Sequence, residues 1–174
     1  MLLKKDIKAK EIAIGGLLVA MNLIVLIGTS LFPTMKLSLL FITALITVLT
    51  IVKSNVLMAC MVYGITSIAG FLLIPEKSIW LLYVFFFGNY PIIKYELEKL
   101  RKPILECLGK LLFLNMMLLA LGYIGIKLMG LSIEIPYAYW IVYGMAQPFF
   151  VFYDWILTKI ITWMAEKFKR FLDS

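Results

Sequence analysis

The amino-acid sequence predicts an all-α integral membrane protein with six transmembrane helices and both termini in the cytoplasm. Of the 174 residues, 63% are apolar, and the mean hydropathy of +1.00 is higher than one soluble core of this length can account for. The apolar residues gather in six runs separated by turn signals. Lysine and arginine collect beside alternate ends of these runs, which predicts the orientation.

Each run is assigned to one membrane span, because a hydrocarbon core of about 30 Å requires about 20 apolar residues per helix. The first run follows a lysine-rich start and is longer than a signal-peptide core, so we expect it to remain in the membrane. The second and fourth runs are short. We expect the six to form one transmembrane domain over residues 1–174. The predicted spans are 12–32, 37–52, 55–74, 79–93, 104–127 and 137–163.

Turn-forming and charged segments separate these spans. Prolines or polar clusters lie at 32–34, 53–55, 75–78 and 130–136. Residues 91–103 mix apolar and charged side chains between two prolines, which predicts an amphipathic connector at the level of the lipid headgroups. The last span is expected to continue beyond the membrane as an amphipathic helix.

The orientation follows from counting basic residues on each side of the six-span arrangement. Three lie on the predicted outer side: Lys36, Lys77 and Lys127. An odd number of spans would place the basic C-terminal tail on the other face, against the positive-inside rule. Fourteen lie on the predicted inner side: Lys4, Lys5, Lys8, Lys10, Lys53, Lys94, Lys99, Arg101, Lys102, Lys110, Lys159, Lys167, Lys169 and Arg170.

Composition argues against several classes of chemistry. The chain has no histidine, and its two cysteines, Cys60 and Cys107, form no CxxC motif, so we expect no metal site, no cofactor and no disulfide framework. We predict no catalytic residues and no enzyme. The net charge is +7, and the basic residues flank apolar runs, so we expect them to bind anionic lipid headgroups and not nucleic acid. Asp154, inside the sixth span, is expected to pair with Lys110 or Lys159.

Aromatic and polar residues gather toward the outer halves of the later spans and the first loop. Such a set can line a pocket for a small, flat or partly anionic molecule. An interfacial aromatic belt explains the outermost members equally well. The candidate ligand-binding residues are Thr34, Lys36, Trp80, Tyr83, Asn115, Tyr123, Lys127, Trp140, Tyr143 and Gln147.

Small side chains form one stripe on the first span. Ala9, Ala13, Gly16 and Ala20 are spaced by four, three and four residues, so they share one helix face. In lipid, such a stripe lets another helix approach closely. The approaching helix can belong to a partner protein or to this chain's own bundle.

Six helices in fewer than 200 residues, with this stripe on the first, resemble the substrate-binding S component of an energy-coupling factor (ECF) transporter. In that family, alanines four apart on the first helix dock against a transmembrane coupling subunit. Ala9–Ala13 match the pattern, and Gly16–Ala20 match it with glycine for one alanine. The phrases "GLLVAMNLIVL", "LFPTMKLSLL" and "FFFGNYPIIK" are also similar to an uncharacterised group of small membrane proteins from Gram-positive bacteria.

The resemblance implies a bacterial plasma-membrane protein that binds a vitamin-like micronutrient in the outer halves of helices four to six, beneath the first loop. It also implies a coupling subunit and two ATPase subunits as partners. Two other hypotheses remain open. One is a membrane scaffold like the cell-shape protein MreD, acting through its cytoplasmic amphipathic segments. The other is a small secondary transporter with Asp154 as its coupling site.

Overall fold

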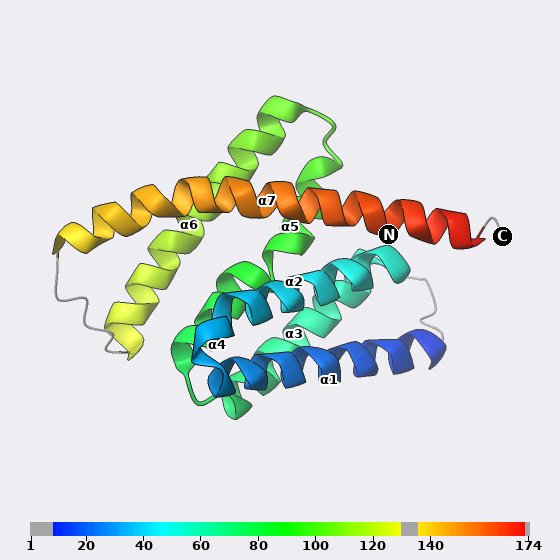
Figure 1. Cartoon of the computed structure of the whole chain (residues 1–174), viewed down its shortest axis with the longest axis horizontal. Helices are drawn as coiled ribbons and strands as arrows, with labels where there is room; N and C mark the ends of the chain where they lie inside the picture. Colours follow the sequence, from blue (N-terminus) through cyan, green and yellow to red (C-terminus); the bar gives the residue numbers. More distant parts are fainter. Residues whose placement is uncertain (1–8, 130–135, 173–174) are drawn as a thin grey trace, which may run out of the picture. The chain divides into compact units, whose positions relative to one another are not determined.

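The structure, a computed structural model, describes residues 9–129 and 136–172, and all the elements in these residues are helical. The predicted all-α fold is therefore confirmed for the described residues. In chain order (Figure 1), the elements are α1 (Ala9–Leu31), the 3₁₀ helix η1 (Pro33–Met35), α2 (Lys36–Lys53), α3 (Val56–Leu73), α4 (Lys77–Leu82), the π-helix η2 (Tyr83–Phe87), α5 (Tyr90–Glu98), α6 (Pro103–Met129) and α7 (Pro136–Leu172).

Four helical segments are long and apolar enough to cross a membrane: Glu11–Leu31, Pro33–Lys53, Val56–Leu73 and Pro103–Ile124. They correspond to the first, second, third and fifth predicted spans. These helices are compatible with a membrane location. The fourth and sixth predicted spans are not among the four found in the described residues, so the six-span count and the orientation stay predictions.

Local chemistry explains where the helices begin and end. Asn55 caps α3, since its side-chain oxygen accepts a hydrogen bond from the Met58 backbone N–H at 2.8 Å. At the other end of α3, the Lys77 ammonium donates to the carbonyls of Phe71 and Ile74, which have no partner within the helix. The helices α6 and α7 each begin at a proline, a residue suited to the first helical turn.

The described residues form two compact units; along the chain, the first ends at residue 96 and the second begins at residue 97. In the first unit, α1, α2 and α3 pack against one another, and α4 and η2 pack against this group. Leu18, Ile46 and Val62 form one buried cluster, with one residue from each of the three helices. Close packing of this kind holds helices together in lipid, where burial from water contributes little.

The helix α2 carries three buried threonines whose hydroxyls bond within the helix itself. The hydroxyls of Thr43, Thr47 and Thr50 are buried, and each donates to a carbonyl three or four residues earlier in α2. Because these bonds need no second helix, α2 can carry three threonines in an apolar setting.

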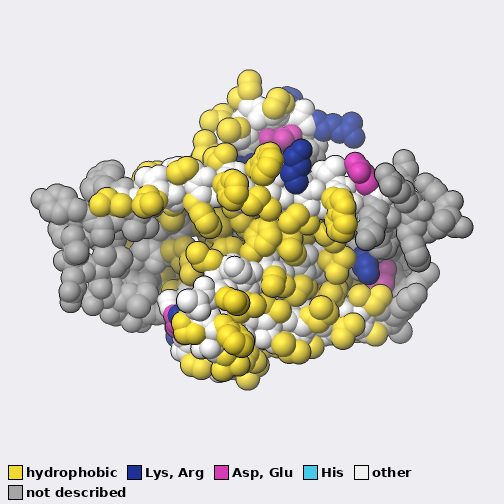
Figure 2. Space-filling view, in the orientation of Figure 1, with side chains coloured by type: hydrophobic (Ala, Val, Ile, Leu, Met, Phe, Trp, Pro, Cys, Tyr) yellow, Lys and Arg dark blue, Asp and Glu magenta, His cyan; other side chains and the backbone are white. Residues whose placement is uncertain are grey.

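The outward faces of the first unit are apolar. On α1, Leu17, Ile24 and Leu31 are 63–70% exposed, and on α3 Ile68 and Leu72 are more than 70% exposed. Figure 2 shows hydrophobic side chains dominating the visible surface over α1. Such a continuous apolar surface suits contact with lipid acyl chains.

The fourth predicted span, 79–93, consists of three elements with a turn inside it. After α4, the hydrogen bonds lengthen to the π pattern, in which Gly88 N–H donates to the Tyr83 carbonyl at 2.8 Å. Residues 88 and 89 then form a turn, and α5 begins at Tyr90, one residue before the expected proline. Gly88 permits this turn to pack closely, because a Cβ there would lie 2.8 Å from the Tyr83 ring.

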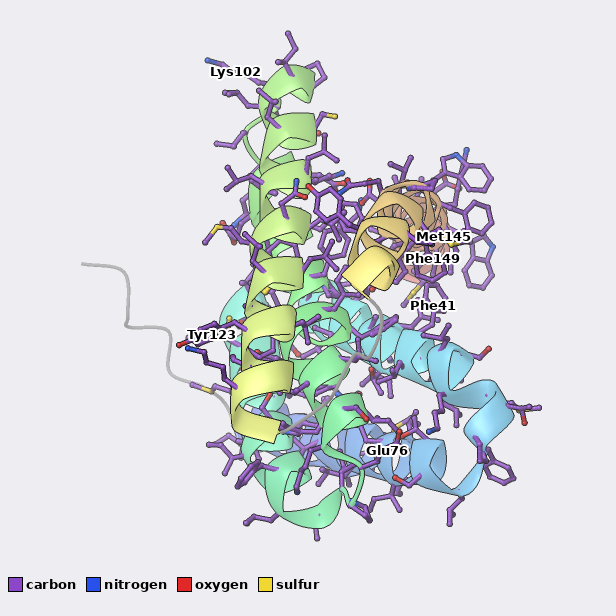
Figure 3. All side chains as sticks on the ribbon, turned by 90° about the vertical axis from the view of Figure 1, so that its left-hand side faces the viewer. Phe41, Glu76, Lys102, Tyr123, Met145 and Phe149 are labelled. Atoms are coloured by element: carbon purple, nitrogen blue, oxygen red, sulfur yellow. The ribbon has the colours of Figure 1, made fainter. Side chains whose placement is uncertain are left out.

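The second unit contains the crossing helices α6 and α7. Lys102 and Tyr123 lie toward opposite ends of α6, while Met145 and Phe149 project from α7 on the side away from α6 (Figure 3). The helix α7 is 37 residues long and continues unbroken past residue 163, where the sixth predicted span ends, to Leu172, which confirms the expected helical extension. Pro148 lies inside this helix.

Candidate functional site

Three of the predicted ligand-binding residues meet where α6 and α7 face each other. Tyr143 and Gln147 lie one turn apart on α7, and both donate a hydrogen bond to the side-chain oxygen of Asn115 on α6. The distance from the Gln147 amide nitrogen to that oxygen is 3.1 Å. The Asn115 amide nitrogen donates to the Leu111 carbonyl at 2.9 Å. We call Asn115, Tyr143 and Gln147 the amide cluster.

The amide cluster retains hydrogen-bonding capacity. The Gln147 side-chain oxygen makes no hydrogen bond to any described residue. Asn115 and Gln147 are half-buried, and Tyr143 is 42% exposed. The cluster therefore offers an amide acceptor and amide N–H donors to a neutral polar group that approaches from outside the unit.

Pro148 adds a backbone acceptor near the same turn of α7. Proline has no N–H, so it cannot donate to the carbonyl of Gly144, four residues earlier. Gly144 is exposed, and a Cβ at this position would meet nothing within 4 Å. The Gly144 carbonyl therefore lacks the N–H donor that the regular α-helical pattern would supply to it from position 148.

An ion cluster joins the same two helices closer to residue 103. The Lys110 ammonium on α6 lies 3.0 Å from a carboxylate oxygen of Asp154 on α7 and 3.0 Å from one of Glu98 at the end of α5. The Lys110 side chain is 14% exposed. The pairing of Asp154 with Lys110, one of the two partners expected from the sequence, is confirmed.

A small groove opens beside the ion cluster within the second unit. Its volume is about 210 Å³. This is smaller than the 300–1,000 Å³ typical of sites for drug-sized ligands. The lining residues are Pro103, Glu106, Cys107, Lys110, Leu111, Phe150, Val151 and Asp154.

Two of the ligand candidates in the first unit, Lys36 and Trp80, have polar groups that already bind other residues of that unit. Lys36 pairs with Glu76 at 2.6 Å, and this contact holds the pKa of the Glu76 carboxyl below its usual value. The Trp80 indole N–H donates to the Ser67 carbonyl at 2.8 Å. Tyr83 is fully buried in the unit, and Thr34 is exposed in η1.

Two candidates near the end of α6 contact each other. The Lys127 ammonium lies 5.1 Å from the centre of the Tyr123 ring, a cation–π contact. Tyr123 is 62% exposed. The Trp140 side chain lies outside the described residues. Of the ten candidates, the structure thus brings together Asn115, Tyr143 and Gln147 in one cluster, and Tyr123 with Lys127 in another.

The small-residue stripe faces outward within its own unit. Ala13, Gly16 and Ala20 are all exposed, and a Cβ added to Gly16 would meet nothing within 4 Å. The residues that α1 buries against its own unit, such as Leu18 and Leu26, lie on another face. The Ala9 side chain lies outside the described residues. The described part of the stripe is therefore open to a helix that does not belong to the first unit.

Sequence reasoning missed two residues that matter here. Glu98 is the second carboxylate on Lys110, and Tyr63 donates its hydroxyl to the Val84 carbonyl of η2 at 2.8 Å. The spacing of residues along the sequence predicts contacts within one helix, whereas each of these two pairings joins residues of different helices. Among the described residues, no group of three acidic, cysteine or histidine side chains is placed to hold a metal ion.

No family model, curated protein or solved structure matches this chain.

Proposed function

We propose that the protein is the substrate-binding membrane subunit of a micronutrient importer, of the ECF type, with the ligand held at the amide cluster. The observation that supports this most is the convergence of Asn115, Tyr143 and Gln147 from two helices of the second unit. Polar side chains at this depth are costly in lipid, and they are concentrated where substrates bind. The proposal includes six spans and cytoplasmic termini.

The chemistry of the amide cluster indicates what the ligand carries. All three side chains are uncharged, so they suit a ligand with neutral hydrogen-bonding groups such as an amide, a hydroxyl or a ring nitrogen. Tyr143 also offers an aromatic face. We therefore assign the main ligand contacts to α6 and α7. Trp80 and Tyr83 are less suited, because the Trp80 indole N–H already donates a hydrogen bond and Tyr83 is fully buried in the first unit.

The exposed small-residue stripe of α1 supports the proposal that a coupling subunit binds this protein. A transmembrane helix of a coupling subunit would dock on Ala13, Gly16 and Ala20, because small residues permit close backbone approach. Uptake would then be driven by ATPase subunits bound to that coupling subunit.

The experiment compares three versions of the full-length protein purified from its native membranes. The wild type, Asn115→Leu and the control Met116→Leu are denatured, and the released small molecules are analysed by mass spectrometry. Met116 adjoins Asn115 but is 60% exposed. The proposal requires a compound that the wild type and Met116→Leu release in equal amounts and that Asn115→Leu loses by about tenfold or more, as expected for two lost hydrogen bonds. Equal release from all three would place the ligand elsewhere.

A further inference from the structure

The core of the first unit contains polar side chains that make no hydrogen bond. Asn22, Thr66 and Tyr83 are each 0% exposed. Both polar atoms of the Asn22 amide and the hydroxyls of Thr66 and Tyr83 are without a partner among the described residues. A buried polar group without a partner is strongly unfavourable, so a group of four such atoms requires an explanation.

Helix register places Asn22 and Thr66 at the same level of the unit. The helices α1 and α3 run in the same direction (Figure 1), and Leu18 on α1 belongs to the same buried cluster as Val62 on α3. Asn22 and Thr66 each lie four residues, or about one turn, further along. The polar pair therefore forms the next layer of the core above the apolar one.

Tyr83 completes this layer from η2. Its phenol lies beside the Thr66 hydroxyl, and its ring is 6.1 Å from that of Tyr63, one turn earlier on α3. Tyr83 is also the first residue of the π-helix, and short π segments within α-helices occur frequently at functional sites. Gly88 leaves room for the ring, since a Cβ there would be 2.8–2.9 Å from Tyr83 atoms.

We propose that Asn22, Thr66 and Tyr83 form a second binding site, inside the first unit, that holds water. The three groups are uncharged, and no carboxylate belongs to the layer, so the site does not suit a cation. A buried water needs two to four polar partners, and this layer supplies donors and acceptors of that number. This site is separate from the amide cluster and does not depend on the function proposed for it.

The neighbouring threonines provide the matched control. The Thr43 hydroxyl is equally buried, but it donates to the Leu40 carbonyl of its own helix at 2.6 Å. Thr→Val removes a hydroxyl at nearly constant shape. At Thr43 it removes a bond made within one helix, whereas at Thr66 it removes a partner of the bound water.

The test measures thermal unfolding of the full-length protein in detergent. If water occupies the site, Thr66→Val and Tyr83→Phe each lower the midpoint by about 2–4 °C more than Thr43→Val does, because the water loses a partner. A direct contact between the Thr66 and Tyr83 hydroxyls could lower the midpoint of these two variants without any water. Asn22→Leu therefore decides the question, because in a dry site it removes a buried amide without a partner and raises the midpoint, whereas loss of a water ligand lowers it. A rise, or a change equal to that of Thr43→Val, overturns the proposal.

A second measurement uses the wild type and does not rely on variants that fold. A structure of the full-length chain at a resolution that shows ordered water should contain a single water-sized density within hydrogen-bond distance of Asn22 and of Thr66 or Tyr83. Clear side-chain density with nothing between these groups would overturn the proposal. Density larger than water would also overturn it and would identify a small polar solute as the occupant.

Discussion

The Lys110 ammonium lies 3.0 Å from the Asp154 carboxylate and so ties α6 to α7. Lys110 also pairs with Glu98, so one cation is shared by two carboxylates. Pairing at this site explains how a carboxylate is tolerated on the helix that carries Tyr143 and Gln147. It also favours a structural role for Asp154 over a role as a proton carrier.

Removing the shared cation should therefore destabilise the second unit. We expect Lys110→Met to lower the free energy of unfolding by roughly 1–3 kcal/mol, less than for a fully buried pair because Glu98 is about one-third exposed. Lys102→Met is the control, since Lys102 is exposed, and should change it by less than about 0.5 kcal/mol. Thermal or denaturant unfolding in detergent measures both. Equal effects of the two substitutions would show that the ion cluster contributes nothing specific.

The contact between Lys36 and Glu76 predicts a pH dependence. The hydrogen bond from Lys36 lowers the pKa of Glu76 from its ordinary value of 4.5, so the folded state binds this proton less readily than the unfolded state does. The stabilisation is present above pH 4.5 and is lost as the pH falls through the lowered folded-state pKa. We expect an effect below about 1 kcal/mol, because both side chains are about one-third exposed or more.

The measurement is the difference in unfolding midpoint between the wild type and Glu76→Gln, followed from pH 7 to pH 3. The wild type should be the more stable at pH 7, and its advantage should vanish at the acid end. An advantage that is constant over this range would mean that the Glu76 charge is not involved.

The close packing at Gly88 predicts a large effect for one methyl group. Gly88→Ala would place a carbon 2.8 Å from the Tyr83 ring and 2.9 Å from the Tyr63 ring, and we expect a loss of about 1–3 kcal/mol in stability. Gly64→Ala on α3 is the matched control, since its Cβ would meet nothing within 4 Å. There, alanine should be neutral or stabilising by up to about 1 kcal/mol. Similar unfolding midpoints for the two variants would contradict the described packing.

Much of this fold could be predicted from the sequence, because run length and turn residues are local signals. They predicted the four long apolar helices, and two of the polar candidates in the later spans, Asn115 and Gln147, are hydrogen-bonded to each other. The π-helix at Tyr83 had no such signal in the sequence, and its contacts with Tyr63 and Thr66 join residues from different elements. Lys36 was expected to meet a ligand, but a loop-to-loop contact with Glu76 cannot be inferred from spacing.

The outward stripe on α1 predicts a variant that separates folding from partner binding. Gly16→Leu or Ala20→Leu should abolish co-purification of a coupling subunit and ATPases from native membranes without lowering the unfolding midpoint, because neither position is packed within its unit. Ile24→Leu, on the same exposed face, is the control and should retain the partners. A loss of stability in Gly16→Leu would instead indicate that the stripe packs against this chain.

The most direct test of the central claim is the mass of the intact wild-type protein released from detergent micelles under native conditions. We expect the 19.9 kDa chain to carry one additional small-molecule mass, which disappears on denaturation and is absent from Gln147→Leu. A wild-type protein from native membranes that shows only the mass of the bare chain would contradict a substrate-binding function and would favour the membrane-scaffold hypothesis.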